Sequence, residues 1–180
     1  MKRSVHVALL KEGTTMNYAL RMTNLAALIV ATTLSSGAFA QKPVTLNSTC
    51  QAIGIAPQEP VGDREGHTYS VSQYSCQNQG GPFDGAVMTG STIWESDKGN
   101  SVALAGSGVI RKPGMSAVFV LTEGKNSLIM ADGKVTGFSG TAKGVYKVAA
   151  GTASSLAGKS FSSTFRSIGG GQFVIETTVD

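Results

Sequence analysis

Histidine and cysteine are rare in this chain of 180 residues, which contains two of each. Only one histidine, His67, follows residue 40, so a charge relay or a metal site in that part would have to include it. The G-x-S-x-G motif is absent, which excludes the nucleophile elbow of the α/β-hydrolases. We therefore predict no catalytic residue, no metal site and no cofactor.

Apolar runs long enough to cross a bilayer are also missing. The longest such stretch, Leu25–Leu34, has about ten residues, whereas a membrane-spanning helix needs about 20. It is followed by Ala38-Phe39-Ala40, a typical signal-peptidase site. We predict a signal peptide over residues 1–40, with Met16 or Met22 as an alternative start. The domain of residues 41–180 is then periplasmic or secreted, without a transmembrane anchor after cleavage.

Runs of basic residues are absent from residues 41–180. Cleavage after Ala40 lowers the formal net charge from +4 to +1, because it removes Lys2, Arg3, Lys11, Arg21 and Glu12. The densest basic spot that remains is Arg111-Lys112, which is far smaller than the patches that bind nucleic acids. We expect no nucleic-acid partner, and the sequence leaves the oligomeric state open.

The two cysteines, Cys50 and Cys76, both belong to the predicted mature domain. An even number of cysteines in an exported protein favours a disulfide. Two cysteines and one distant histidine do not supply the four ligands of a structural zinc site. We therefore predict a Cys50–Cys76 disulfide.

The mature sequence has the patterns of short β-strands and no sustained helical period. Alternating apolar and polar residues are bounded by turn formers such as Asp97-Lys98-Gly99-Asn100 and Asp132-Gly133. Residues 149–159 are small and are expected to form at most a turn or two of helix. The expected strands are 44–51, 67–77, two within the hairpin 85–114, 115–122, 127–131, 134–138, 144–148, 161–168 and 172–179.

This series of short strands joined by tight turns indicates an antiparallel meander. Closure into a single β-barrel of about eight strands removes the exposed sheet edges. A two-sheet β-sandwich is the alternative architecture. Glycines within the strand patterns are interpreted as sites of bulges and bends that curve the sheet; they are Gly90, Gly106, Gly108, Gly137 and Gly144.

Aromatic residues are the main candidates for a binding site. In a closed barrel they either fill the core or line a cavity. A cavity would be lined by Trp94, the only tryptophan, and by Tyr146, with Arg166 as its polar anchor. Glu95 alternates out of phase with Trp94 and is expected to point away from the core, although a lumen carboxylate is the alternative.

Residues 133–146, GKVTGFSGTAKGVY, resemble a Gly- and Phe-containing stretch of allene-oxide-cyclase and dirigent-type β-barrels. Gly90-Ser91-Thr92 and residues 105–109 extend the resemblance to about a third of the mature chain. The pattern departs from the family at Ala142 and Lys143, which precede Gly144. The resemblance implies an eight-stranded antiparallel barrel with a hydrophobic interior and transfers no catalytic residue. The chain is also similar to small exported bacterial proteins.

Three functional hypotheses follow from these observations. The first is an exported, non-enzymatic β-barrel that binds a small apolar ligand or a partner protein. The second, which the resemblance implies, is a cyclase or isomerase that acts on a hydrophobic ligand inside the barrel. The third is an envelope-associated structural module without a ligand.

Overall fold

The computed structural model describes residues 43–53 and 57–180, and the predicted signal peptide lies outside these ranges. The described residues form nine strands and two single-turn 3₁₀ helices. No helix among them has the length and apolarity required to span a membrane. The strands are β1 (Val44–Ala52), β2 (Gln58–Pro60), β3 (His67–Gln79), β4 (Val87–Asp97), β5 (Asn100–Lys112), β6 (Met115–Ala131), β7 (Lys134–Gly151), β8 (Ser160–Gly169) and β9 (Gln172–Val179).

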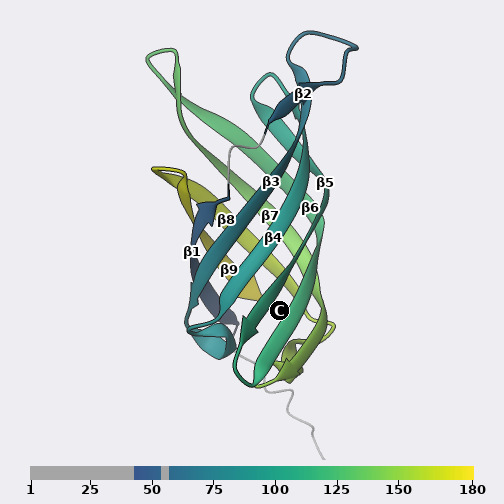
Figure 1. Ribbon diagram of the computed structural model, residues 1–180, viewed down its shortest axis with the longest axis vertical. Helices are drawn as coiled ribbons and strands as arrows, with labels where there is room; N and C mark the ends of the chain where they lie inside the picture. The colour runs from purple at the N-terminus through teal and green to yellow at the C-terminus, as the bar shows by residue number, and fades with distance from the viewer. Residues whose placement is uncertain (1–42, 54–56) are drawn as a thin grey trace, which may run out of the picture. The chain divides into compact units, whose positions relative to one another are not determined.

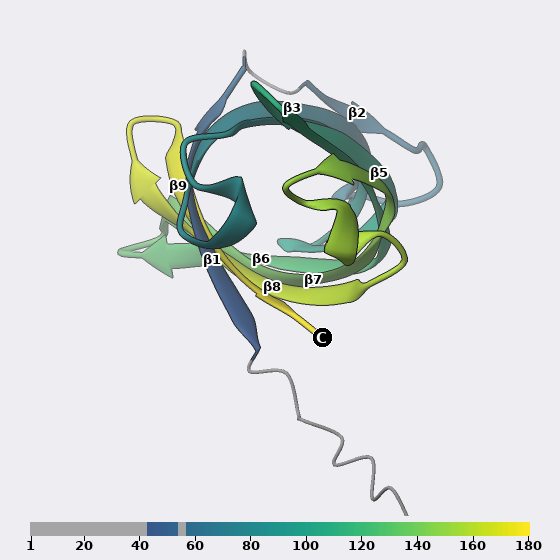
Figure 2. The ribbon, with the colours of Figure 1, turned by 90° about the horizontal axis from the view of Figure 1, so that it is seen from below.

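The strands form a closed antiparallel barrel (Figures 1 and 2). From β3 to β9 each strand pairs with the next in the chain, and β1 pairs with both β9 and β3 to close the sheet. The short β2 pairs only with the upper part of β3. Eight strands thus form the wall and β2 is an additional strand, which confirms the predicted barrel and excludes the two-sheet alternative.

Side chains alternate between the lumen and the outer face along each strand. On β3, Tyr74 and Cys76 face inward, whereas Tyr69 and Val71 are exposed on the outer face. The inward set is mostly apolar, and the outward set includes most of the charged residues of the domain. The period of two therefore separates an apolar interior from a largely polar outer wall.

Two strands are longer than the sequence patterns indicate. Separate strands were expected at 115–122 and 127–131, but β6 continues through Glu123–Asn126, with a register shift between Leu121 and Glu123 in its pairing with β7. The two separate strands expected at 134–138 and 144–148 are both part of β7. The turn-like composition was misleading because Gly124 and Asn126 occupy inward positions while Glu123 and Lys125 face solvent.

The prediction that strand glycines mark bulges is confirmed in part. Gly144 and Gly137 pair with Leu121 and Ile129, each directly before a register shift between β6 and β7. Gly90 and Gly108 lie in regular pairing between β4 and β5. Most inward glycines lie beneath a large side chain of a neighbouring strand. A Cβ atom on Gly90 would lie 2.5 Å from the Tyr74 ring, and one on Gly108 would lie 2.5 Å from both the Phe119 ring and the Thr89 carbonyl oxygen.

One end of the barrel is closed by the two 3₁₀ turns, η1 (Gly81–Phe83) and η2 (Ser154–Leu156). Figure 2 shows both turns, in teal and yellow-green, inside the outline of the barrel. Their side chains Phe83 and Leu156 are buried in the core cluster together with Met115, Tyr146 and Phe161. The segment expected to contain a short helix is thus a 3₁₀ turn that forms part of the floor of the barrel.

Candidate functional site

The barrel lumen contains a cavity of about 310 Å³. Its floor is formed by side chains from the closed end, including Tyr146 and Phe161. Its upper wall includes Gln58 of β2 and Leu128 of β6, near the hairpin ends drawn at the top of Figure 1. The barrel is therefore a cup with one closed and one open end, and the cavity volume is at the lower end of the range of small-molecule sites.

Eight aromatic rings line the cavity. Neighbouring rings are in contact, with centroid separations of 5.0–6.3 Å and inclined or edge-on planes that are favourable for aromatic pairs. The rings come from six different strands, so the wall is assembled from the whole barrel. They are Tyr74, Trp94, Phe119, Phe138, Tyr146, Phe161, Phe165 and Phe173.

Trp94 is half-buried and faces the cavity, as its predicted role requires. Its indole Nε1 donates a hydrogen bond to Ser72 Oγ at 3.0 Å, and Ser72 in turn donates to the Thr92 carbonyl oxygen. The indole ring also packs at 6.2 Å from the ring of Phe165. These contacts hold one face of the indole against the wall and satisfy its only polar atom.

Tyr146 lies at the floor of the cavity, 3% exposed, between the rings of Phe83 and Phe161. Burial raises the pKa of its phenol far above the ordinary value. Burial also raises the pKa of Tyr74, and a hydrogen bond with Thr92 partly offsets this effect. Both phenols are therefore neutral at physiological pH and add no charge to the lumen.

Hydroxyl groups in the wall are paired with one another. Ser163 Oγ and Thr177 Oγ1 are 2.7 Å apart, as are Ser96 Oγ and Ser101 Oγ near the mouth. None of the residues that line this cavity is Asp, Glu, Lys, Arg or His. The site consequently offers aromatic surface and a few neutral polar groups, and it offers no counter-charge to an ionic ligand.

Arg166 lies elsewhere. It follows the inward-facing Phe165 on β8 and is exposed on the outer face, where it borders a shallow hollow together with Thr141, Val174 and Glu176. The structure thus brings Trp94 and Tyr146 to one cavity and does not bring Arg166 to it. The alternation on β8, with Phe161, Ser163 and Phe165 inward, is the sequence signal that places Arg166 outside.

The predicted disulfide is present in the structure. Cys50 of β1 and Cys76 of β3 are directly opposite each other in the antiparallel pairing, and their sulfur atoms are bonded. Both residues are almost completely buried. The bond therefore joins the two strands whose pairing closes the barrel.

A charged cluster on the outer face was not foreseen from the sequence. His67, 6% exposed, lies 2.6 Å from Asp63 through Nδ1 and 2.7 Å from Glu95 through Nε2. Arg64 binds Asp63 and also Asp97, at 2.9 Å. The out-of-phase position of Glu95 indicated its outward orientation correctly, but its proximity to His67 depends on the register of β3 and β4, in which His67 is opposite Asp97.

Known metal-binding geometries are not found among residues 43–53 and 57–180, where no three His, Cys, Asp or Glu side chains are grouped to hold an ion. The carboxylates at His67 occupy opposite sides of the imidazole ring and do not converge on a common point. Comparison with protein-family models gives no match, and no curated protein sequence matches this chain.

Proposed function

We propose that this protein is an exported binding protein whose barrel lumen holds one small, neutral, apolar molecule. The observation that carries the proposal is the aromatic cavity of about 310 Å³ without a charged lining residue. Eight-stranded barrels have just enough interior for side chains or for one small ligand, and here the side chains leave part of the volume free. The disulfide supports an oxidising compartment, such as the periplasm or the extracellular space.

The absence of charge in the lumen favours binding over catalysis. An ionised ligand would lose its hydration on entry and would find no opposite charge in the wall. A cyclase or isomerase mechanism by general acid–base catalysis needs a titratable group near neutrality, and both tyrosines titrate well above it. We therefore rank ligand binding above the enzymatic alternative.

A matched pair of fluorescent probes tests this proposal. N-phenylnaphthylamine is neutral, and anilinonaphthalene sulfonate has the same aromatic frame with an added sulfonate. We expect the neutral probe to bind with 1:1 stoichiometry and at least about tenfold more tightly, and to quench the emission of Trp94 by energy transfer. Equal affinity for both probes, or no binding of either, would overturn the proposal.

A pair of adjacent substitutions on β7 locates the probe. Ala142 faces the cavity and Thr141 faces solvent, so Ala142→Phe fills the lumen whereas Thr141→Phe leaves it unchanged. We expect Ala142→Phe to abolish binding of the neutral probe and Thr141→Phe to retain it. Thermal unfolding of both variants shows whether each remains folded. Loss of binding in both variants, or in neither, would place the probe outside the lumen.

A further inference from the structure

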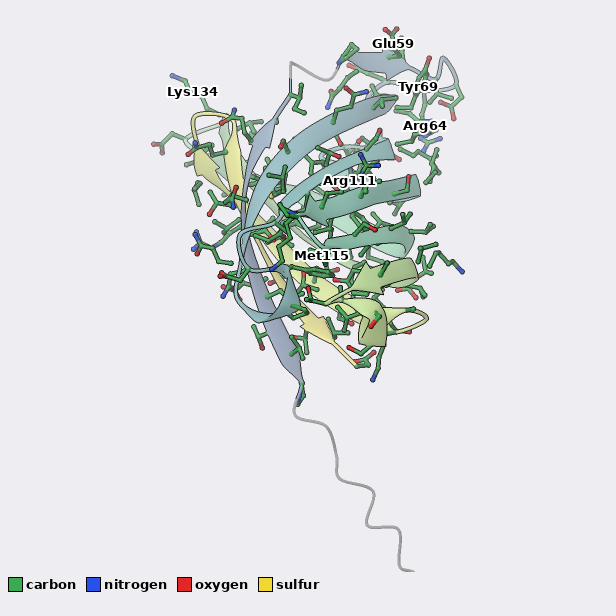
Figure 3. The ribbon with its side chains drawn as sticks, turned by 60° about the horizontal axis from the view of Figure 1, so that its bottom comes forward. Glu59, Arg64, Tyr69, Arg111, Met115 and Lys134 are labelled. Atoms are coloured by element: carbon green, nitrogen blue, oxygen red, sulfur yellow. A yellow bond between two sulfur atoms is a disulfide. The ribbon has the colours of Figure 1, made fainter. Side chains whose placement is uncertain are left out.

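The segment from Pro57 to Gly66 contains no buried side chain, although it lies at the mouth of the cup. It comprises β2 and the loop that leads to β3, and Gln58 of β2 contributes to the cavity wall. Figure 3 shows Glu59 of β2 and Arg64 of the loop at the same end of the barrel as Tyr69. Because hydrophobic burial does not hold this segment, its position depends on polar contacts.

Two kinds of polar contact hold the segment. The three residues of β2 pair with residues 68–70 of β3, and the Val61 amide donates a hydrogen bond to the His67 carbonyl oxygen at 3.0 Å. The side-chain contacts come from the cluster of Asp63, Arg64, His67, Glu95 and Asp97, in which His67 is the only buried member.

The protonation state of His67 controls this cluster. A carboxylate only accepts hydrogen bonds, so both ring nitrogens of His67 must be protonated to donate to Asp63 and Glu95 at the same time. A neutral imidazole has one N–H group, and its other nitrogen would present a lone pair to a carboxylate oxygen. Loss of one proton therefore replaces an attractive contact with a repulsive one.

We propose that these five residues form a pH-dependent latch, which holds β2 and its loop against the mouth of the cup and limits the rate of ligand exchange. The ligand-exchange part of this inference rests on the proposed binding function. The latch itself is a property of the loop, of His67 at the start of β3 and of β4, and it can be measured without a ligand.

The groups that face His67 determine the direction of the pH effect. The hydrogen bond with Asp63, followed by that with Glu95, raises the pKa of His67 above its ordinary value of 6.5, and Arg64 opposes this shift. The bond with His67 is also the main cause of the lowered pKa of Asp63. The hydrogen bond with Asp97 raises the pKa of Arg64, which remains charged across the neutral range. The latch is therefore closed at pH 6 and opens as the pH rises through the raised pKa of His67.

Amide exchange of Val61 tests the latch directly. The ratio of exchange rates between the His67→Gln variant and the wild type cancels the intrinsic pH dependence of exchange. We expect Val61 to exchange about tenfold faster in the variant at pH 6, as after loss of a charge-assisted hydrogen bond, and the ratio to approach one at high pH. Glu95 is more exposed than His67, so Glu95→Gln disturbs the packing less. The exchange ratio of Val61 in this variant should show the same dependence on pH. A ratio that does not vary with pH in either variant would overturn the latch.

Release of N-phenylnaphthylamine tests the role of the latch in exchange. We expect the release rate of the wild type to rise with pH and that of His67→Gln to be fast at every pH. Glu123→Gln, which removes an exposed ion pair with Lys143 on the outer wall, is the control and should behave as the wild type. Equal release profiles for the wild type and His67→Gln would overturn the role in exchange. Failure of the probe to bind would contradict the proposed function, while Val61 exchange would still decide the latch.

Discussion

At the scale of single residues, the lumen is shaped by pairs of a glycine and a large side chain. Five inward glycines each provide space for a ring or a leucine from a neighbouring strand, so that bulky side chains fit within a barrel of small radius. The pairs are Gly90 with Tyr74, Gly106 with Leu121, Gly108 with Phe119, Gly140 with Phe165 and Gly144 with Phe161. The free volume therefore depends on glycines as much as on the aromatic residues.

Gly108→Ala should be destabilising by about 1–3 kcal/mol. The added Cβ would lie 2.5 Å from both the Phe119 ring and the backbone oxygen of Thr89, and the backbone atom cannot rotate away. Ser107→Ala, one position along β5 and exposed on the outer face, should change the free energy of unfolding by less than about 0.5 kcal/mol. Urea denaturation of the two variants measures both values. A neutral Gly108→Ala would show that the strand has room to move outward.

The sequence was sufficient to predict the orientation of most side chains, because alternation alone determines which face a strand residue occupies. It correctly placed Trp94 inward and Glu95 outward. The same rule, applied to β8, places Arg166 on the outer face. The prediction that Arg166 faces the lumen was wrong, because it assumed that a cavity needs a polar anchor and did not use the alternation. The pairs of a glycine and a large side chain could not be predicted from the sequence. The side chain that lies over each glycine belongs to another strand, and its position depends on the register between the two strands.

At the scale of elements, β6 and β7 have the greatest influence on the site, and both are longer than the strands predicted from the sequence. The pairing of β6 with β5 ends at Ser127, and the pairing of β7 with β8 ends at Ser139. Beyond these residues β6 and β7 pair only with each other, up to the turn at Asp132-Gly133. Figure 3 shows Lys134 at the tip of this hairpin. Polar residues and glycines at inward positions resemble a turn locally, so strand continuity could be established only from the neighbouring strands.

The loop between β2 and β3 makes the stability of the protein depend on pH. The raised pKa of His67 means that its contribution is complete below the unfolded-state value of 6.5 and is lost as the pH rises through the folded-state pKa. The lowered pKa of Asp63 means that its contribution is present above 3.8 and is lost as the pH falls through the folded-state pKa. The cluster is therefore most stabilising between about pH 4 and pH 6.5.

Denaturation of the wild type and of His67→Gln across the pH range measures this contribution. We expect the difference in free energy of unfolding to be largest near pH 5–6 and to decrease on both sides. Lys143→Gln, which removes the exposed ion pair with Glu123 between β6 and β7, should give a difference that is flat over the same range. A constant difference between the wild type and His67→Gln would show that His67 contributes through packing alone.

At the scale of the whole molecule, closure depends on a single strand. β1 has nine residues and pairs with β9 on one side and with β3 on the other, so separation of either pairing would convert the barrel into an open sheet. The two cysteines are 26 positions apart. The stretch between them includes the exposed segment Pro57–Gly66, and the disulfide ties β1 to β3 across this segment. The sequence predicted the bond, and the structure shows that it lies at the closing pair of strands.

Reduction of the disulfide should lower the free energy of unfolding by about 3 kcal/mol, the loop-entropy value for a loop of this length. Because the bond joins β1 to β3, we also expect faster amide exchange along β1 while the β6–β7 pairing remains protected. A Cys50→Ala/Cys76→Ala variant should match the reduced wild type, and the reductant should have no effect on it. A loss below about 1 kcal/mol, or exchange that increases equally in all strands, would show that backbone pairing alone is sufficient for closure.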